Sequence, residues 1–170
     1  MATRWVGTVL AACGTIGFAW QGTTKTTTPY DKWLNEDVVY IIKAEERAAF
    51  TRLRTDEERN HFIEQFWQRR DPTPNTAPNE FKEEHYRRIA YGNKRFRAPS
   101  RAGWATDRGR IYIIYGPPDE IENHPRDRFE QWLYHDIKGL GKNIMMDFRD
   151  ADKSGDYRLS GPPKPIQLKK

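Results

Sequence analysis

Cysteine is almost absent from this chain of 170 residues, which contains only Cys13. The rest of the chain therefore has no intrachain disulfide available and must be stabilised by packing. Long apolar runs are also scarce, since Trp5–Phe18 is the longest stretch of this kind and is too short to cross a bilayer comfortably. No serine or cysteine nucleophile lies in a recognisable catalytic context.

The middle of the chain has no excess of positive or negative charge. The protein has a net charge of +5, yet residues 31–150 contain equal numbers of acidic and basic residues. The surplus comes from Arg4, Lys25 and residues 151–170. The sequence therefore shows no basic stripe that could follow a phosphate backbone, and we expect no nucleic-acid partner.

The first 20 residues have the organisation of a secretory signal peptide. Arg4 gives a positive start, Trp5–Phe18 forms the apolar core, and Ala19 is a small residue at the expected cleavage site. A lipoprotein signal is the alternative, because Leu10-Ala11-Ala12-Cys13 resembles a lipobox and Cys13 would then carry a lipid anchor. An uncleaved membrane anchor is a third alternative. All three predict export to the periplasm or cell envelope.

One globular domain is predicted over residues 31–160, because the chain is long enough for one sizeable core and too short for two. Residues 21–30, which contain a run of Thr, predict a flexible linker before it. Residues 161–170 are rich in Pro and Lys and predict a disordered basic tail. Aromatic residues make up 13% of the chain, so we expect them to build much of the core.

Helices are predicted in the first half of the domain. Thr55 and Glu58 have the spacing of a capping box, and apolar residues follow at helical intervals up to Trp67. A shorter helix is predicted over 43–53, and a third helix from Pro78 to about Phe96. Before these helices, Trp33 and Leu34 predict a short helix or turn, and Val38–Ile42 predicts an extended segment.

Strands are predicted in the second half. Ile111–Tyr115 is a short apolar run between glycines, rich in β-branched and aromatic residues, and we expect it to be a buried central strand. Two more strands are predicted at Phe129–His135 and Asn143–Arg149, with a loop at Gly139–Gly141 between them, and an edge strand within Ser154–Leu159. This order predicts an α+β fold, with about three N-terminal helices packed on a C-terminal antiparallel sheet of three to four strands.

The most distinctive stretch is Gly103-Trp104-Ala105-Thr106-Asp107. In a functional interpretation, Trp104 is a platform for a sugar or peptide and Asp107 is an acid, a base or a hydrogen-bond acceptor. In the structural interpretation, which we favour, Trp104 fills the core while Thr106 and Asp107 pin a turn that leads into the central strand. The candidate binding or structural residues here are Gly103, Trp104, Thr106, Asp107, Arg108 and Arg110. A buried Asp107 carboxylate could also pair with Arg108, Arg110 or a more distant arginine.

A second group of candidates comprises Asp119, Glu120, Glu122 and His124. The last three would point to one side of an extended chain, which suits a hydrolytic or hard-metal group. We favour a solvated loop after Gly116-Pro117-Pro118 instead. The sequence therefore predicts no metal and no cofactor.

Several motifs together resemble the bacterial family named after its Gly-Trp-x-Thr-Asp motif, the GWxTD family. They are Gly103–Asp107, Arg108–Arg110, Tyr115–Ile121, Phe62–Pro72, Tyr86–Tyr91 and Glu130–Trp132, so the resemblance covers roughly residues 33 to 160. It implies an exported bacterial protein and implies no particular reaction.

We predict an exported, non-catalytic envelope module that binds a protein or glycan partner. The alternative is a carboxylate-dependent hydrolase that uses Asp107, Asp119 or Glu120. An enzyme should bring at least two of these carboxylates together in a concave pocket. An interaction module should instead show each of them capped or paired.

Overall fold

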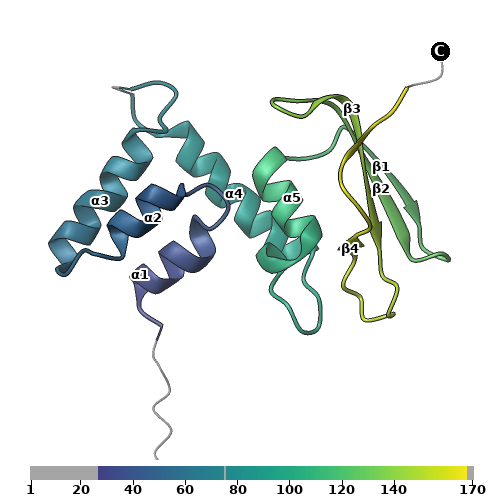
Figure 1. The fold of residues 1–170 in the computed structure, drawn as a ribbon, viewed down its shortest axis with the longest axis horizontal. Helices are drawn as coiled ribbons and strands as arrows, with labels where there is room; N and C mark the ends of the chain where they lie inside the picture. The colour runs from purple at the N-terminus through teal and green to yellow at the C-terminus, as the bar shows by residue number, and fades with distance from the viewer. Residues whose placement is uncertain (1–26, 75, 168–170) are drawn as a thin grey trace, which may run out of the picture.

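The computed structural model describes residues 27–74 and 76–167. The predicted signal peptide, Cys13 and most of the predicted linker lie outside these residues. Within the described ranges, no helix combines the length and apolar character needed to cross a bilayer. Helices come first and an antiparallel sheet follows (Figure 1), which confirms the predicted α+β class.

Four short elements form the first part of the fold. They are α1 (Pro29–Lys32), the π-helical turn η1 (Trp33–Asp37), α2 (Ala44–Phe50) and α3 (Asp56–Gln68). The predicted capping box of α3 is confirmed, since the Thr55 hydroxyl accepts a hydrogen bond from Glu58 N at 3.2 Å and the Glu58 carboxylate accepts one from Thr55 N at 3.1 Å.

Two local predictions fail in this region. Thr28, assigned to the flexible linker, caps α1 by accepting a hydrogen bond from Asp31 N at 3.1 Å, and Pro29 begins the helix with a backbone angle that suits its first turn. The extended segment predicted at Val38–Ile42 is a hydrogen-bonded turn, because Ile41 N and Ile42 N both donate to Val38 O. Val38 is fully buried and anchors that turn.

These elements enclose a first hydrophobic core made largely of aromatic rings, as composition predicted. Trp33 and Phe66 meet edge to face with their ring centroids 5.1 Å apart. The buried members of this core are Trp33, Leu34, Val38, Phe50, Phe66 and Trp67.

The long helix α4 (Glu80–Arg95) joins this core to the rest of the molecule, and Asn79 caps it. Figure 1 shows it running from the α1–α3 group to α5. Residues in its first half, including His85, contact the first core, whereas Phe96, just after its end, belongs to the second core. The helix predicted from Pro78 is therefore confirmed, with its start at Glu80.

The predicted central strand at Ile111–Tyr115 is wrong, because these residues form the second half of helix α5 (Asp107–Tyr115). Thr106 caps this helix, and Gly116 ends it with a φ of 89°. Ile111, Tyr112 and Ile113 are all buried, and α5 lies between α4 and the sheet (Figure 1). A helix that is buried on several sides lacks the polar face of an amphipathic helix. Its short apolar run therefore has the same sequence pattern as a buried strand.

The sheet has the order β1-β2-β3-β4, and β5 pairs with another part of β3. Its strands are β1 (Glu120–His124), β2 (Phe129–Ile137), β3 (Gly141–Arg149), β4 (Arg158–Leu159) and β5 (Lys164–Pro165), all of whose pairings are antiparallel. The strands predicted at Phe129–His135 and Asn143–Arg149 are thus confirmed.

Two segments predicted to be irregular belong to this sheet. Glu120–His124, expected in a solvated loop, pairs with β2 so that Ile121 lies opposite Trp132. Lys164–Pro165, expected in a disordered tail, pairs with Ile144 and Met145 of β3. Proline is tolerated at this position because β5 is a two-residue strand at the edge of the ladder.

A second hydrophobic core fills the space between α5 and the sheet. Every second residue in part of β2 and β3 is buried, so each strand presents one face to α5. These core residues are Trp132 and Tyr134 on β2, and Ile144, Met146 and Phe148 on β3. The Tyr134 hydroxyl donates to Gly116 O at 3.0 Å, and burial raises the pKa of this tyrosine. The end of α5 is thereby fixed to the sheet.

Candidate functional site

Two glycines, Gly103 and Gly109, allow the 3-10 turn η2 (Gly103–Ala105) to lie directly against α4 and α5. A Cβ atom at Gly103 would lie 2.0 Å from Gly92 O of α4, and a Cβ at Gly109 would lie 1.8 Å from Gly103 O. Both distances are far shorter than any real contact of a Cβ atom. The close packing of η2, α4 and α5 therefore requires glycine at positions 103 and 109.

Thr106 links η2 to α5 through its hydroxyl group. This side chain is 1% exposed; it donates a hydrogen bond to Gly103 O at 2.8 Å and accepts one from Gly109 N at 3.1 Å. It is the N-cap that satisfies a free N–H group in the first turn of α5.

Asp107 acts over a longer range than a local turn. Its carboxylate accepts a hydrogen bond from Leu159 N of β4 at 2.9 Å. Arg110, one turn along the helix, lies 3.5 Å from the other carboxylate oxygen. Asp107 also stands in the first turn of α5, where the helix dipole favours a negative charge. It therefore ties α5 to β4.

The main chain of Trp104 is held in place by two side chains, those of Asn93 and Tyr40. Its N–H donates to the Asn93 side-chain oxygen at 2.9 Å, and its carbonyl accepts a hydrogen bond from the Tyr40 hydroxyl at 3.1 Å. The Tyr40 ring lies 6.2 Å from the indole, and burial raises the pKa of Tyr40. The indole itself is only partly buried and does not fill either core.

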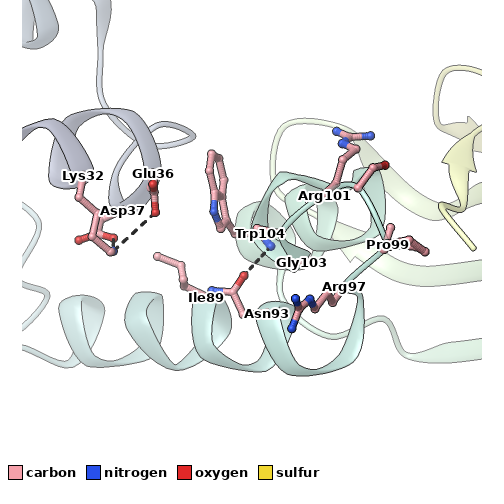
Figure 2. Close-up of a pocket in the computed structure, with 13 residues that line it drawn as sticks. Lys32, Glu36, Asp37, Ile89, Asn93, Arg97, Pro99, Arg101, Gly103 and Trp104 are labelled. Atoms are coloured by element: carbon pink, nitrogen blue, oxygen red, sulfur yellow. Dashed lines mark hydrogen bonds and ion pairs between the residues drawn. The ribbon is translucent and has the colours of Figure 1, made fainter. Parts of the chain in front are cut away.

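The indole lines a cavity of about 470 Å³. Figure 2 shows it standing between the acidic residues at the end of the first helices and the loop that precedes η2. The lining residues are Lys32, Glu36 and Asp37, then Ile89 and Asn93 of α4, then the loop residues Arg97–Ala102, and finally Gly103 and Trp104.

Charges of both signs surround this cavity. Lys32 is ion-paired with Asp37 and lies 3.9 Å from a carboxylate oxygen of Glu36. Arg101 pairs with Asp156 at 3.0 Å and also donates to Ala105 O. Arg97 is exposed and has no ion pair or side-chain hydrogen bond within residues 27–74 and 76–167.

Arg108 is engaged in the interior and does not pair with Asp107. Its guanidinium contacts Glu130 at 3.0 Å and lies 4.3 Å above the Tyr157 ring, with both side chains of the ion pair mostly buried. The Trp132 indole N–H donates to the same Glu130 carboxylate. This network fixes α5 onto β2.

Asp119 and Glu120 lie elsewhere, on either side of His135 of β2. Asp119 accepts a hydrogen bond from His135 N at 2.6 Å, and the imidazole lies 3.3 Å from Glu120. All three side chains are about half exposed or more. Asp107 contacts β4 instead, so the three candidate carboxylates do not come together in one pocket.

Some site residues escaped the sequence interpretation. Asn93 and Tyr40 hold the main chain of Trp104, and Arg97 lines the same cavity. Asn93 lies in the last turn of the third predicted helix and Arg97 just beyond its end, so their four-residue spacing is only a weak signal for one surface. Tyr40 gave no such signal. In the described part of the chain, no three His, Cys, Asp or Glu side chains gather as a metal-binding group.

A comparison with family models decides the relationship that the motif suggested. The model described as the GWxTD domain matches residues 24–162. The chain belongs to the GWxTD domain family. The GWxTD residues are thus those that join η2, α4, α5 and β4, with the indole of the motif left at the cavity wall. Comparisons with curated proteins and with solved structures found no significant match.

Proposed function

We propose that this GWxTD protein is an exported, non-catalytic module of the cell envelope that binds a partner in the cavity beside Trp104. The observation that carries the proposal is the partly exposed indole whose main chain is fixed by Asn93 and Tyr40. A rigid aromatic surface of this kind loses little conformational entropy when a ligand covers it.

The lining favours a polar partner over an apolar one. Asn93, Arg97 and Ser100 surround the cavity with groups that can donate hydrogen bonds, and Arg97 has no partner within the described ranges. An indole beside such donors suits a sugar ring, whose apolar face stacks while its hydroxyl groups are hydrogen-bonded. We therefore favour an envelope glycan and keep an envelope protein as the second outcome of the test.

The hydrolase alternative has less support. Asp107 is occupied by Leu159 N, whereas Asp119 and Glu120 lie beside His135 on an exposed part of the sheet. General acid and base groups need to converge on one reacting bond. The contacts of these carboxylates thus favour the binding module.

The proposal is tested by measuring binding of soluble peptidoglycan fragments to the purified protein by calorimetry. Trp104→Ala removes the stacking surface but keeps the main-chain bonds to Asn93 and Tyr40, and Arg97→Ala removes an exposed donor. Each change is expected to weaken binding at least about tenfold, the loss of about 1.4 kcal/mol. Arg52→Ala, at an exposed arginine outside the cavity lining, is the matched control and should bind like the unchanged protein.

A second outcome is that the protein binds an envelope protein and not the fragments, and that Trp104→Ala abolishes this binding. That result would identify a protein partner at the same cavity. Equal binding by the Trp104→Ala, Arg97→Ala and Arg52→Ala variants would reject the cavity as the binding site. Turnover of the fragments that is abolished by a change at Asp107, Asp119 or Glu120 would favour the hydrolase.

A further inference from the structure

The loop between β3 and β4 has the residue spacing of a calcium-binding loop. Asp150, Asp152 and Ser154 alternate along it, and Gly155 follows. These residue types occupy the first, third, fifth and sixth positions of calcium loops of the EF-hand type. The loop differs from that type in being flanked by strands, and in having Gly161 where the bidentate glutamate would stand.

The main chain of this loop makes two sharp turns, and groups of the loop donate hydrogen bonds to its own carboxylate oxygens. Lys153 and Gly155 have φ angles of 59° and 83°, so the chain turns sharply at both. Gly155 N donates to Asp150 Oδ2 at 3.1 Å, and the Ser154 hydroxyl donates to Asp152 Oδ1 at 2.7 Å. Carboxylate and hydroxyl groups thereby gather on the inner side of the loop.

Buried oxygen atoms without a donor provide the independent observation. The Asp150 side chain is 1% exposed, and no donor among the described residues reaches its Oδ1 atom. A buried carboxylate oxygen without a donor costs free energy unless a cation or water satisfies it.

Arginines occupy the other sides of these carboxylates. Arg128 contacts Asp150 Oδ2 at 2.9 Å from a half-exposed position. Asp156, whose side chain is 2% exposed, is paired through Oδ2 with Arg101 at 3.0 Å and Arg158 at 3.6 Å, and its Oδ1 likewise lacks a donor among the described residues. The arginines therefore leave one oxygen of each buried carboxylate without a partner.

We propose that this loop binds a Ca²⁺ ion through the carboxylates of Asp150 and Asp152, the hydroxyl of Ser154 and the main-chain carbonyl of Asp156. Oxygen ligands of this kind select Ca²⁺ or Mg²⁺ over transition metals, and an irregular ligand arrangement without octahedral geometry favours Ca²⁺. Only two carboxylates contribute, and Arg128 competes for one of them. The affinity is therefore expected in the weak class of extracellular modules, with a Kd of about 10⁻⁴–10⁻³ M.

The same loop adjoins the cavity beside Trp104. Asp156 holds Arg101, which lines the cavity, and a Cβ at Gly155 would lie 3.6 Å from the Pro99 ring on the cavity wall. A bound ion would therefore restrict the motion of the residues that line the cavity. The Ca²⁺ proposal does not depend on which partner, if any, binds in the cavity.

The test uses the full chain, freed of metal by a chelator and titrated with CaCl₂ to about 10 mM at constant ionic strength, well above the expected Kd. The melting temperature is expected to rise by about 3–10 °C, the range that the expected Kd values give at this Ca²⁺ concentration. Tb³⁺ bound at the same loop should show luminescence sensitised by Tyr157, which follows Ser154 by three residues, and Ca²⁺ should displace it.

Asp152→Asn should abolish both responses, and Ser154→Ala should weaken Tb³⁺ binding. Asp152 is exposed, so its substitution is not expected to unfold the protein. Asp127→Asn, at an exposed carboxylate in the turn between β1 and β2, should leave both responses intact. The proposal is overturned if the unchanged protein does not respond to Ca²⁺ or Tb³⁺, if NaCl of matched ionic strength gives the same shift, or if Asp152→Asn responds equally.

Discussion

The Asp107 carboxylate accepts a hydrogen bond at 2.9 Å from the main-chain N–H of Leu159, a residue 52 positions further along the chain. One end of this contact is the first turn of α5, and the other is the short strand β4. The last residue of the GWxTD motif thus joins the helical part of the molecule to the edge of the sheet.

Replacement of Asp107 by Asn should lower stability by about 1 kcal/mol, because a charge-assisted hydrogen bond becomes a neutral one. The melting temperature is expected to fall by about 3 °C in calorimetry. Asp127→Asn serves as the control, since this exposed residue makes no ion pair within the described ranges. Unchanged stability of the Asp107→Asn protein would show that the bond to Leu159 N contributes nothing.

Replacement of Gly103 by Ala should be far more damaging, because the added Cβ would lie 2.0 Å from a main-chain oxygen of α4 that cannot move aside alone. We expect a loss of at least about 3 kcal/mol, measured by urea unfolding. Gly161→Ala adds the same methyl group where no atom lies within 4 Å and should be nearly neutral. Similar unfolding midpoints for both variants would contradict the proposed close packing of η2 on α4.

Glu46 should make the protein sensitive to acid. Burial acts to raise the pKa of this carboxyl, but hydrogen bonds from Arg70, Lys43 N and Arg69 outweigh it and lower the pKa to about 2. Since the folded-state pKa lies below the usual 4.5, the stabilisation is complete above pH 4.5 and is lost as the pH falls toward 2.

Glu46→Gln is therefore expected to lower stability by about 2 kcal/mol at pH 7 and by progressively less as the pH falls below 4.5. Urea unfolding from pH 7 to pH 2.5 measures this difference. Glu45→Gln, at the exposed neighbouring residue, is the control and should not reproduce it. A destabilisation by Glu46→Gln that stays constant over this range would refute the role of its charge.

The sequence by itself determined the fold class, most helices and the main hairpin. Thr55 and Glu58 marked the start of α3, and alternating large side chains marked β2 and β3, because these signals depend on residues close together in the chain. It also carried the family relationship, since the motif residues were readable before any contact was known. The spacing Asp150-x-Asp152-x-Ser154-Gly155 is likewise visible in the sequence, but the spacing alone does not show that an oxygen of Asp150 is buried without a donor.

Only the tertiary structure decided that Ile111–Tyr115 is helical and that the indole of Trp104 borders a cavity. A short apolar run buried between α4 and the sheet has the same pattern in either conformation, so its neighbours settle the choice. The contacts of Gly103 with α4 and of Asp107 with β4 join residues distant in sequence, and no local pattern of residues encodes such distances.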